Sequence, residues 1–300
     1  MKRFLKTHAK RFLPNGLKRW LRQRIARPLP GNPDAMLTVT KEGEALQCSL
    51  DGKWRFLAPL ECVHELEDFR TSPDGVDELS GIARWGAALS QAKGGKAVLF
   101  DVGAHAGLVS TLFCALTEGN RAYGFEPSPH LASRFEEIRQ LNGFAERMIF
   151  QPVGIGGGPG EIEMLIDSEG GFVQIAHFSH SMWGRPEVIR IPVETLGASA
   201  ARLGIVPDCV KIDIEGYEFE ALKGASAFLS EHRPLLFFEL HLDYLDQRGL
   251  SPKEVIGMLS SCGYRFHAFS GAVLKPADLH DSVLPMVRFV ACPPGFTPPA

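Results

Sequence analysis

The sequence contains no CxxC pair and no long apolar run. Its cysteines are scattered and number six: Cys48, Cys62, Cys114, Cys209, Cys262 and Cys292. This spacing supports neither a zinc knuckle nor a thioredoxin-type motif, and free thiols in a reducing cytoplasm are the simplest interpretation. No apolar stretch approaches the ~20 residues of a membrane-spanning helix, and the basic N-terminus lacks the apolar core of a signal peptide. We therefore predict a cytoplasmic protein.

The chain also has little overall charge. It has 300 residues, of which 45% are hydrophobic, and its net charge is −3, which is ordinary globular composition. Residues 1–27 hold ten of the 32 basic residues and no acid, so the remainder has 22 basic residues against 35 acids, a net charge of −13. Nucleic-acid partners need clustered Lys and Arg, so the acidic body argues against nucleic-acid methylation.

The basic arm, residues 1–27, has apolar residues at helical spacing, among them Leu13, Leu17 and Leu21. A basic amphipathic helix can lie on an anionic membrane surface, so peripheral membrane association is one interpretation. The alternatives are a short helix docked on the acidic body, or a partly ordered terminus. Three prolines in the stretch 28–33 end the helical pattern.

The rest of the chain divides by its periodicity. Residues 36–58 alternate around glycine turns and predict a small β-meander, and residues 61–90 follow as a mixed helical stretch. From residue 97, strands alternate with helices; the strand segments are 97–103, 121–127, 148–155, 209–216, 235–241, 264–270 and 286–292. This pattern is typical of a doubly wound, mostly parallel, Rossmann-like α/β sheet. A hairpin insertion lies between the third and fourth strands, before residue 209.

We accordingly predict four parts: a basic arm over 1–27, a β/α extension over 28–90, an α/β domain over 91–292 and a flexible tail over 293–300.

In a doubly wound sheet, ligands bind beyond the carboxyl ends of the strands. The segment "DVGAHAGLVS" (101–110) lies at that place after the first strand. Gly103 and Gly107 allow a tight turn there, but a dinucleotide fingerprint would need glycine at His105 and Leu108. A pyrophosphate cradle, and with it a nicotinamide oxidoreductase, is therefore poorly supported.

Two acidic residues favour a different ligand. Asp101 places a carboxylate at the mouth of the glycine turn, where it suits an ammonium group or the field of a sulfonium, as S-adenosylmethionine (SAM) presents. Glu126 ends the second strand, and an acid at this place can accept hydrogen bonds from ribose hydroxyls. The combination of Asp101, Gly103, Gly107 and Glu126 predicts a SAM site.

Four segments resemble the signature blocks of the FkbM-type methyltransferases, which are SAM-dependent O-methyltransferases of the class I fold. They are "FDVGAHAGLVS", "GFEPSP", "VKIDIEGYEFEALKGA" and "PLLFFELH", and the resemblance covers roughly residues 97–270. It implies a seven-stranded sheet with an antiparallel last strand, in which Asp101, Gly103 and Glu126 hold SAM. His105 stands where the family usually has Asn, and Gly197 where it usually has Asp. His105 is expected to contact the carboxylate of the cofactor.

The sheet order of this class also brings the segments "KIDIEG" and "FELH" to one rim. There Asp213, Glu215, Glu239 and His241 would surround the transferred methyl group. An acceptor hydroxyl must lose a proton, and a base near neutral pKa does this best. His241 is the natural candidate, with Glu239 or Asp213 as its orienting partner or as an alternative base.

Two other interpretations of this group stay open. Asp213, Glu239 and His241 could hold a divalent metal such as magnesium or calcium, or His241 could simply be a hydrogen-bonded histidine at a strand end. Lys211 is expected to pair with Glu215 or Asp213, and Glu218 to face solvent.

The predicted function is transfer of a methyl group from SAM to a hydroxyl of a sugar, a glycan or another small molecule. The loop 177–186 would cover the pocket, with His180, Ser181, Trp183 and Arg185 against the acceptor. The alternatives are a nicotinamide oxidoreductase on a similar sheet and a non-catalytic SAM-fold binding protein.

Overall fold

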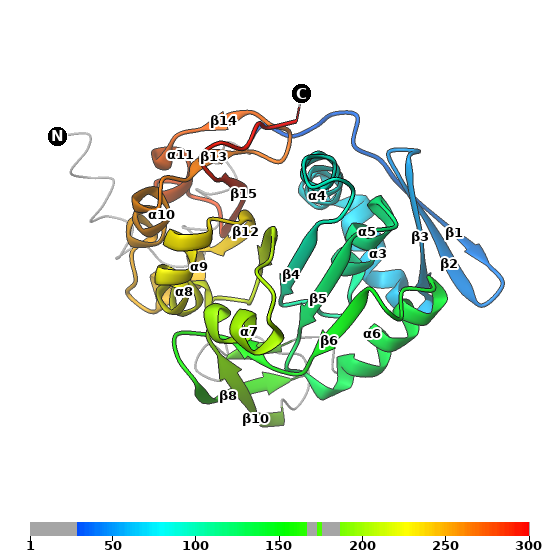
Figure 1. The fold of residues 1–300 in the computed structure, drawn as a ribbon, viewed down its shortest axis with the longest axis horizontal. Coiled ribbons are helices and arrows are strands. Elements are labelled where there is room, and N and C mark those ends of the chain that lie inside the picture. The colour runs from blue at the N-terminus through cyan, green and yellow to red at the C-terminus, as the bar shows by residue number, and fades with distance from the viewer. Residues whose placement is uncertain (1–28, 167–172, 176–186, 300) are drawn as a thin grey trace.

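The computed structural model describes residues 29–166, 173–175 and 187–299. Its central element is an eight-stranded sheet with the order β14-β13-β15-β12-β11-β4-β5-β6 (Figure 1). The strands are β4 (Val98–Val102), β5 (Arg121–Phe125), β6 (Met148–Gln151), β11 (Cys209–Ile212), β12 (Leu235–His241), β13 (Arg265–His267), β14 (Val273–Leu274) and β15 (Met286–Cys292). The basic arm and the four acceptor residues predicted in the loop 177–186 lie outside the described residues.

The seven predicted strands are all present, and the short edge strand β14 is an addition. Pairs β4–β5, β5–β6, β4–β11 and β11–β12 are parallel, whereas β15 runs antiparallel to both β12 and β13. The predicted mostly parallel α/β fold, with an antiparallel last strand, is therefore confirmed.

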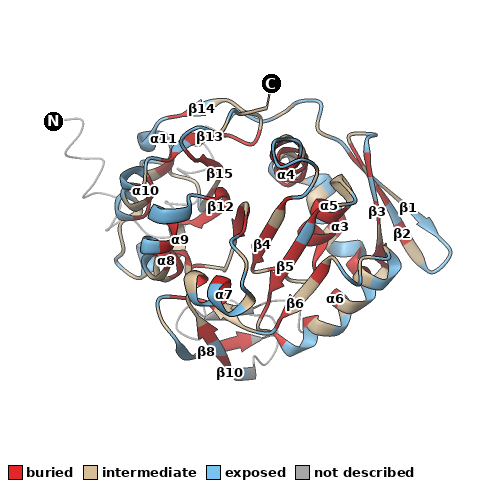
Figure 2. Cartoon of the chain, in the orientation of Figure 1, coloured by how far each residue is buried: buried red, intermediate tan, exposed pale blue. Residues whose placement is uncertain are grey.

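Helices cover both faces of this sheet. The apolar cluster that contains Leu99 and Cys209 packs against α4 (Pro73–Ala92), α5 (Leu108–Leu116) and α6 (Pro129–Leu141). The apolar cluster that contains Phe100 and Val210 packs against five further helices. These are α7 (Leu196–Leu203), α8 (Glu218–His232), α9 (Leu242–Gln247), α10 (Pro252–Ser261) and α11 (Pro276–His280). Alternate residues of each strand therefore belong to opposite faces, and the central strands are buried on both (Figure 2).

The predicted meander is an antiparallel sheet of β1 (Leu37–Glu42), β2 (Ala45–Leu50) and β3 (Trp54–Pro59). The helical stretch after it consists of η2 (Leu60–Cys62), α3 (Val63–Thr71) and α4. Strand β3 packs on α5 and α6, and the Asn142 side-chain amide both donates to the carbonyl and accepts from the N–H of Leu57, each at 2.8 Å. The meander thus shares one apolar core with the large sheet. The proposed domain boundaries stay a prediction.

The predicted hairpin insertion is a second small sheet with the order β7-β10-β8-β9. It comprises β7 (Gly154–Ile155), β8 (Gly160–Ile166), β9 (Val173–Ile175) and β10 (Glu187–Glu194). Met164, Ile191 and Val193 are buried on one side of it. Among the described residues, no helix has the length and apolar character needed to cross a bilayer.

One strand boundary differs from the prediction in a way that shapes the site. Strand β11 ends at Ile212 rather than at Gly216. Glu215 then adopts a left-handed backbone with φ 51°, followed by Gly216 with φ 97°. Positive φ is uncommon for a residue other than glycine, so Glu215 lies in a turn, whereas Asp213 lies just beyond the end of the strand.

Candidate functional site

A cavity of about 680 Å³ opens beyond the carboxyl ends of β4, β5 and β11. The glycine turn after β4 forms one side of it and includes Gly103 and His105. The inserted sheet forms an apolar side with Ile162, Met164, Ile191 and Val193, and helix α3 forms a third side with His64, Glu65 and Asp68. Lys211, Asp213, Glu215, Tyr217 and Arg288 line the remaining part. The cavity therefore lies where an open α/β sheet binds its ligands.

The two glycines of the turn do different things. Gly103 has φ 78°, and a Cβ there would lie 1.8 Å from the carbonyl oxygen of Asp213, so glycine lets β4 and the end of β11 approach closely. Gly107 has φ 89°, and its missing Cβ would lie 2.6 Å from Met148 Cε and 2.7 Å from Phe135 Cδ2. Gly103 borders the cavity, whereas Gly107 allows α5 to pack against its neighbours.

Asp101 lies in the sheet rather than on the cavity wall. Its side chain is fully buried, Oδ2 accepts a hydrogen bond from Ser110 Oγ at 2.7 Å, and Oδ1 has no hydrogen-bond partner within the described part of the chain. It pairs in register with Lys211 on β11. Burial raises the pKa of Asp101, and the charge of Lys211 opposes that shift. The expected contact of Asp101 with a cofactor stays a prediction.

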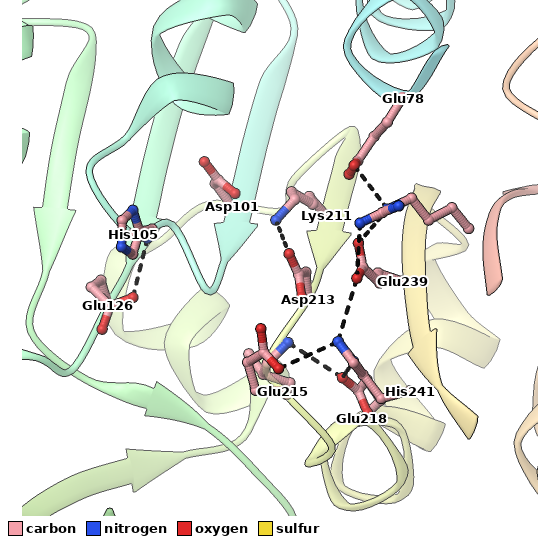
Figure 3. Close-up of polar contacts among 12 residues, drawn as sticks. Glu78, Asp101, His105, Glu126, Lys211, Asp213, Glu215, Glu218, Glu239 and His241 are labelled. Atoms are coloured by element: carbon pink, nitrogen blue, oxygen red, sulfur yellow. Dashed lines mark hydrogen bonds and ion pairs between the residues drawn. The ribbon is translucent and has the colours of Figure 1, made fainter. Parts of the chain in front are cut away.

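Glu126 does border the cavity, at the end of β5. Its Oε2 accepts a hydrogen bond from the backbone N–H of His105 at 3.1 Å (Figure 3). Its Oε1 accepts one from the N–H of Ser128 at 2.9 Å. Each carboxylate oxygen can accept a second bond, so Glu126 keeps capacity for a ligand hydroxyl. Burial raises the pKa of Glu126, and the hydrogen bond from the N–H of Ser128 acts in the opposite direction.

The predicted catalytic side chains meet where the parallel strands β11 and β12 end. We call Asp213, Glu215, Glu218, Glu239 and His241 the carboxylate–histidine cluster. His241 Nδ1 lies 2.8 Å from Glu218 Oε1, and its Nε2 lies 3.4 Å from both Glu215 Oε2 and Glu239 Oε1 (Figure 3). Burial disfavours a charged ring, but the hydrogen bond and charge of Glu218, aided by Glu215 and Asp213, raise the pKa of His241 to about 10. The ring therefore holds a proton at neutral pH in this state.

Glu218 was expected to face solvent, and this prediction is wrong. Its side chain is fully buried at the start of α8, and its Oε1 accepts hydrogen bonds from the N–H of Gly216 at 3.0 Å and from His241. The sequence could have indicated that Glu218 is buried, because it precedes the buried residues Ala221, Leu222 and Ala225 at helical spacing. Glu218, rather than the expected Glu239 or Asp213, orients the imidazole.

Two cationic side chains, Lys211 and Arg288, pair with the carboxylates of Asp213 and Glu239. Lys211 Nζ lies 3.0 Å from Asp213 Oδ2. Arg288 of β15 contacts Glu239 with Nε at 2.5 Å and Nη2 at 3.2 Å, and its Nε lies 3.0 Å from Glu78 of α4. Lys211 was predicted to take this role, whereas Arg288 and Glu78 were missed because they come from distant segments. Burial raises the pKa of Glu239 to about 8 against the charge of Arg288.

Asp213, Glu239 and His241 could also hold a metal ion. Their ligand atoms all lie within 4.8 Å of one another, the only such group in the part of the chain that the structure describes. Both carboxylates are already paired with cationic side chains, so a cation would have to share them with Lys211 and Arg288. The metal alternative stays a prediction.

Carboxyl groups outnumber cationic side chains around the cluster. Its neighbourhood contains more carboxyl groups than cationic groups; the carboxyl groups belong to Glu78, Asp101, Asp213, Glu215, Glu218 and Glu239. Lys211, Arg288 and the protonated His241 supply three positive charges. Buried charges are costly unless they are paired, and burial raises the pKa of Glu78, Asp101, Glu215 and Glu239. A cationic ligand, such as one with ammonium and sulfonium groups, would stabilise the ionised form of these carboxyl groups.

A family model described as the methyltransferase FkbM domain matches residues 101–266, which is more than half of the chain. A search of curated proteins found no match. Among solved structures, the chain is similar to methyltransferase FkbM from Methylobacillus flagellatus, with 18% identity, a TM-score of 0.39, and coverage of 77% of this chain and 59% of that one. It therefore spans about three fifths of the length of that protein.

Two further structures are similar at a comparable level. A SAM-dependent methyltransferase from Agrobacterium tumefaciens has 12% identity and a TM-score of 0.38, with coverage of 69% of this chain and 59% of that one. A TehB-like SAM-dependent methyltransferase from Corynebacterium glutamicum has 14% identity and a TM-score of 0.36, with coverage of 70% and 88% respectively.

Proposed function

This chain belongs to the FkbM methyltransferase family, and we propose that it is a SAM-dependent O-methyltransferase acting on a hydroxyl of a sugar, a glycan or another small molecule. One observation carries the proposal. A single cavity joins the glycine turn and Glu126 at one side to Asp213, Glu215 and the neighbouring His241 at the other. This arrangement supports the proposal that a cofactor and an acceptor bind next to each other in the cavity.

The residues present fit SAM. Gly103 leaves backbone room at the cavity wall, and Glu126 offers carboxylate oxygens to ribose hydroxyls. The carboxyl groups of Asp213 and Glu215 line the same cavity and suit the positive charge of the cofactor. When bound, SAM supplies an electrophilic methyl group on a sulfonium.

The cluster would act on the acceptor through position and proton transfer. Holding the hydroxyl in a near-attack geometry supplies most of the catalysis in such a displacement. Because the ring of His241 is protonated in this state, it can accept a proton only after a positive charge near the cluster lowers its pKa. Glu215 lines the cavity with its Oε2 3.4 Å from Nε2, and burial raises its pKa above the ordinary value, so it is the alternative acceptor.

The binding experiment is isothermal titration with S-adenosylhomocysteine (SAH), the product form of the cofactor. We expect wild-type binding, and about 10- to 100-fold weaker binding in Glu126→Gln, because hydrogen bonds to a charged group are worth roughly 1.5–3 kcal/mol. Glu137→Gln, an exposed acid on α6, serves as the matched control and should bind as wild type does. A wild-type chain that binds neither SAM nor SAH would overturn the proposal.

The acceptor class needs a turnover assay. SAH formation should appear when SAM is incubated with extracts that contain glycans or polyketides, and should fall in His241→Ala. A chain that binds SAH but produces none with any hydroxyl acceptor would instead be a binding protein of this fold. Binding of NADH in place of SAM would identify the oxidoreductase alternative.

A further inference from the structure

Helix α3 lies outside residues 101–266 and yet forms a side of the cavity. His64, Glu65, Asp68 and Phe69 of this helix line it. Leu66, on the same helix, is fully buried, and α3 packs against α4 and β1. The helix is therefore fixed to the protein core on one side while its acidic side faces the place proposed for the cofactor.

One side-chain pair connects this helix to the glycine turn. Glu65 Oε2 lies 3.2 Å from His105 Nδ1, with both side chains partly buried. The backbone N–H of the same His105 donates to Glu126 Oε2 at 3.1 Å. Glu65, His105 and Glu126 thus form a continuous chain of contacts from α3 through the glycine turn to the end of β5.

The conformation of His105 explains why such a contact would matter. Its backbone is left-handed, with φ 50°. This region is uncommon for residues other than glycine, although Asn, Asp and His adopt it more readily than most, and contacts with the surroundings help to hold it. A carboxylate can only accept a hydrogen bond, so Glu65 requires the proton on Nδ1 and fixes the orientation of the ring. Since His105 borders the cavity, that orientation sets part of the cavity wall.

We propose that α3 is a wall of the SAM site in this chain and that Glu65 is a positioning residue, which holds His105 and the glycine turn in the conformation that binds the cofactor. The inference rests on the proposed function, because it takes SAM as the ligand of this turn. Holding the turn before binding lowers the ordering cost that the ligand would otherwise meet. The pair therefore affects cofactor affinity rather than the methyl-transfer step.

A double-mutant cycle tests this role. SAH dissociation constants would be measured by isothermal titration for wild type, Glu65→Gln, His105→Asn and the double variant. When His105 is present, we expect Glu65→Gln to weaken SAH binding about 5- to 10-fold, because the variant loses a partly buried hydrogen bond to a charged group. In the His105→Asn background the same change should have less than a twofold effect. Glu67→Gln is the matched control, because Glu67 is on the same helix but pairs with exposed Arg70.

Two readouts separate positioning from general destabilisation. In Glu65→Gln the KM for SAM should rise while kcat at saturating SAM stays within twofold, and the thermal midpoint of the ligand-free chain should match that of Glu67→Gln. An equal loss of affinity in both His105 backgrounds, or no loss in either, would overturn the inference and leave the proposed function standing. A wild-type chain that binds no SAH would instead overturn the proposed function and this inference together.

Discussion

Replacing Glu218 with Gln removes the charge that holds the His241 ring while keeping the size of the side chain. Glu218 is fully buried, and His241 is 5% exposed. The amide of Gln can still accept a hydrogen bond from Nδ1. The variant therefore tests the charge of this buried pair, not its packing.

The structure sets an upper limit on the effect. The pKa of His241 is raised to about 10 from its ordinary 6.5, and each factor of ten in proton affinity is worth about 1.4 kcal/mol. At pH 7, three factors of ten separate the pH from this pKa, so the protonated ring contributes at most about 4 kcal/mol to folding. Glu215 and Asp213 share this effect. We expect Glu218→Gln to lower the free energy of unfolding by about 2 kcal/mol at pH 7.

The raised pKa of His241 also predicts how the effect of Glu218→Gln on stability changes with pH. A raised pKa in the folded state contributes stability that is fully present below the unfolded pKa, about 6.5, and is lost as the pH rises toward 10. The difference between wild type and Glu218→Gln should therefore be largest at pH 6 and shrink steadily up to pH 10.

The measurement is urea unfolding followed by circular dichroism from pH 6 to 10, with the His241 ring followed by NMR. Glu220→Gln is the matched control, because Glu220 is on the same helix and pairs with Arg248 in a more exposed place. A loss below about 0.5 kcal/mol at pH 6, together with an unchanged titration of His241, would refute the reasoning.

Two further outcomes follow from the packing and from the cluster. Gly81→Ala should lower the free energy of unfolding by about 1–3 kcal/mol, because a Cβ would lie 2.4 Å from Phe269 Cβ. Gly257→Ala, inside α10 with open space around it, should raise the free energy of unfolding by up to about 1 kcal/mol. Urea unfolding measures both variants, and a lower free energy of unfolding for Gly257→Ala would contradict this expectation. Dialysis against EDTA should leave SAH affinity and turnover unchanged, because cationic side chains already pair with Asp213 and Glu239; activity that is lost and then restored by Mn²⁺ would favour the metal alternative.

Much of the fold follows from local sequence patterns. The segment 97–103 and its six counterparts are short apolar runs bounded by glycine, proline or polar residues, and each forms a strand of the large sheet. The helix over Pro129–Leu141 begins after Ser128, with Pro129 at its first position, and ends before Asn142-Gly143, as the preferences of proline and glycine for these places predict. These features depend on neighbours in the sequence, so no tertiary information is needed to locate them.

The site was predicted less completely. Asp213, Glu239 and His241 do meet at one rim, because parallel neighbouring strands end together. The strand β11, however, ends before Asp213, and Asp101 is fully buried beside Lys211 and does not border the cavity. A strand boundary and the direction of a charged side chain depend on what packs around them.

The sequence by itself determined the order of strands and helices, the glycine turn after the first strand of the large sheet, and the chemical types gathered at the carboxyl rim. Tertiary structure alone decided which charges from distant segments meet. The rotation of α8 buries Glu218 against His241, β15 brings Arg288 to Glu239, and α3 brings Glu65 to His105. Charge pairs separated by tens of residues form only when packing fixes the distance and angle between their elements. The periodicity of one element does not specify that geometry.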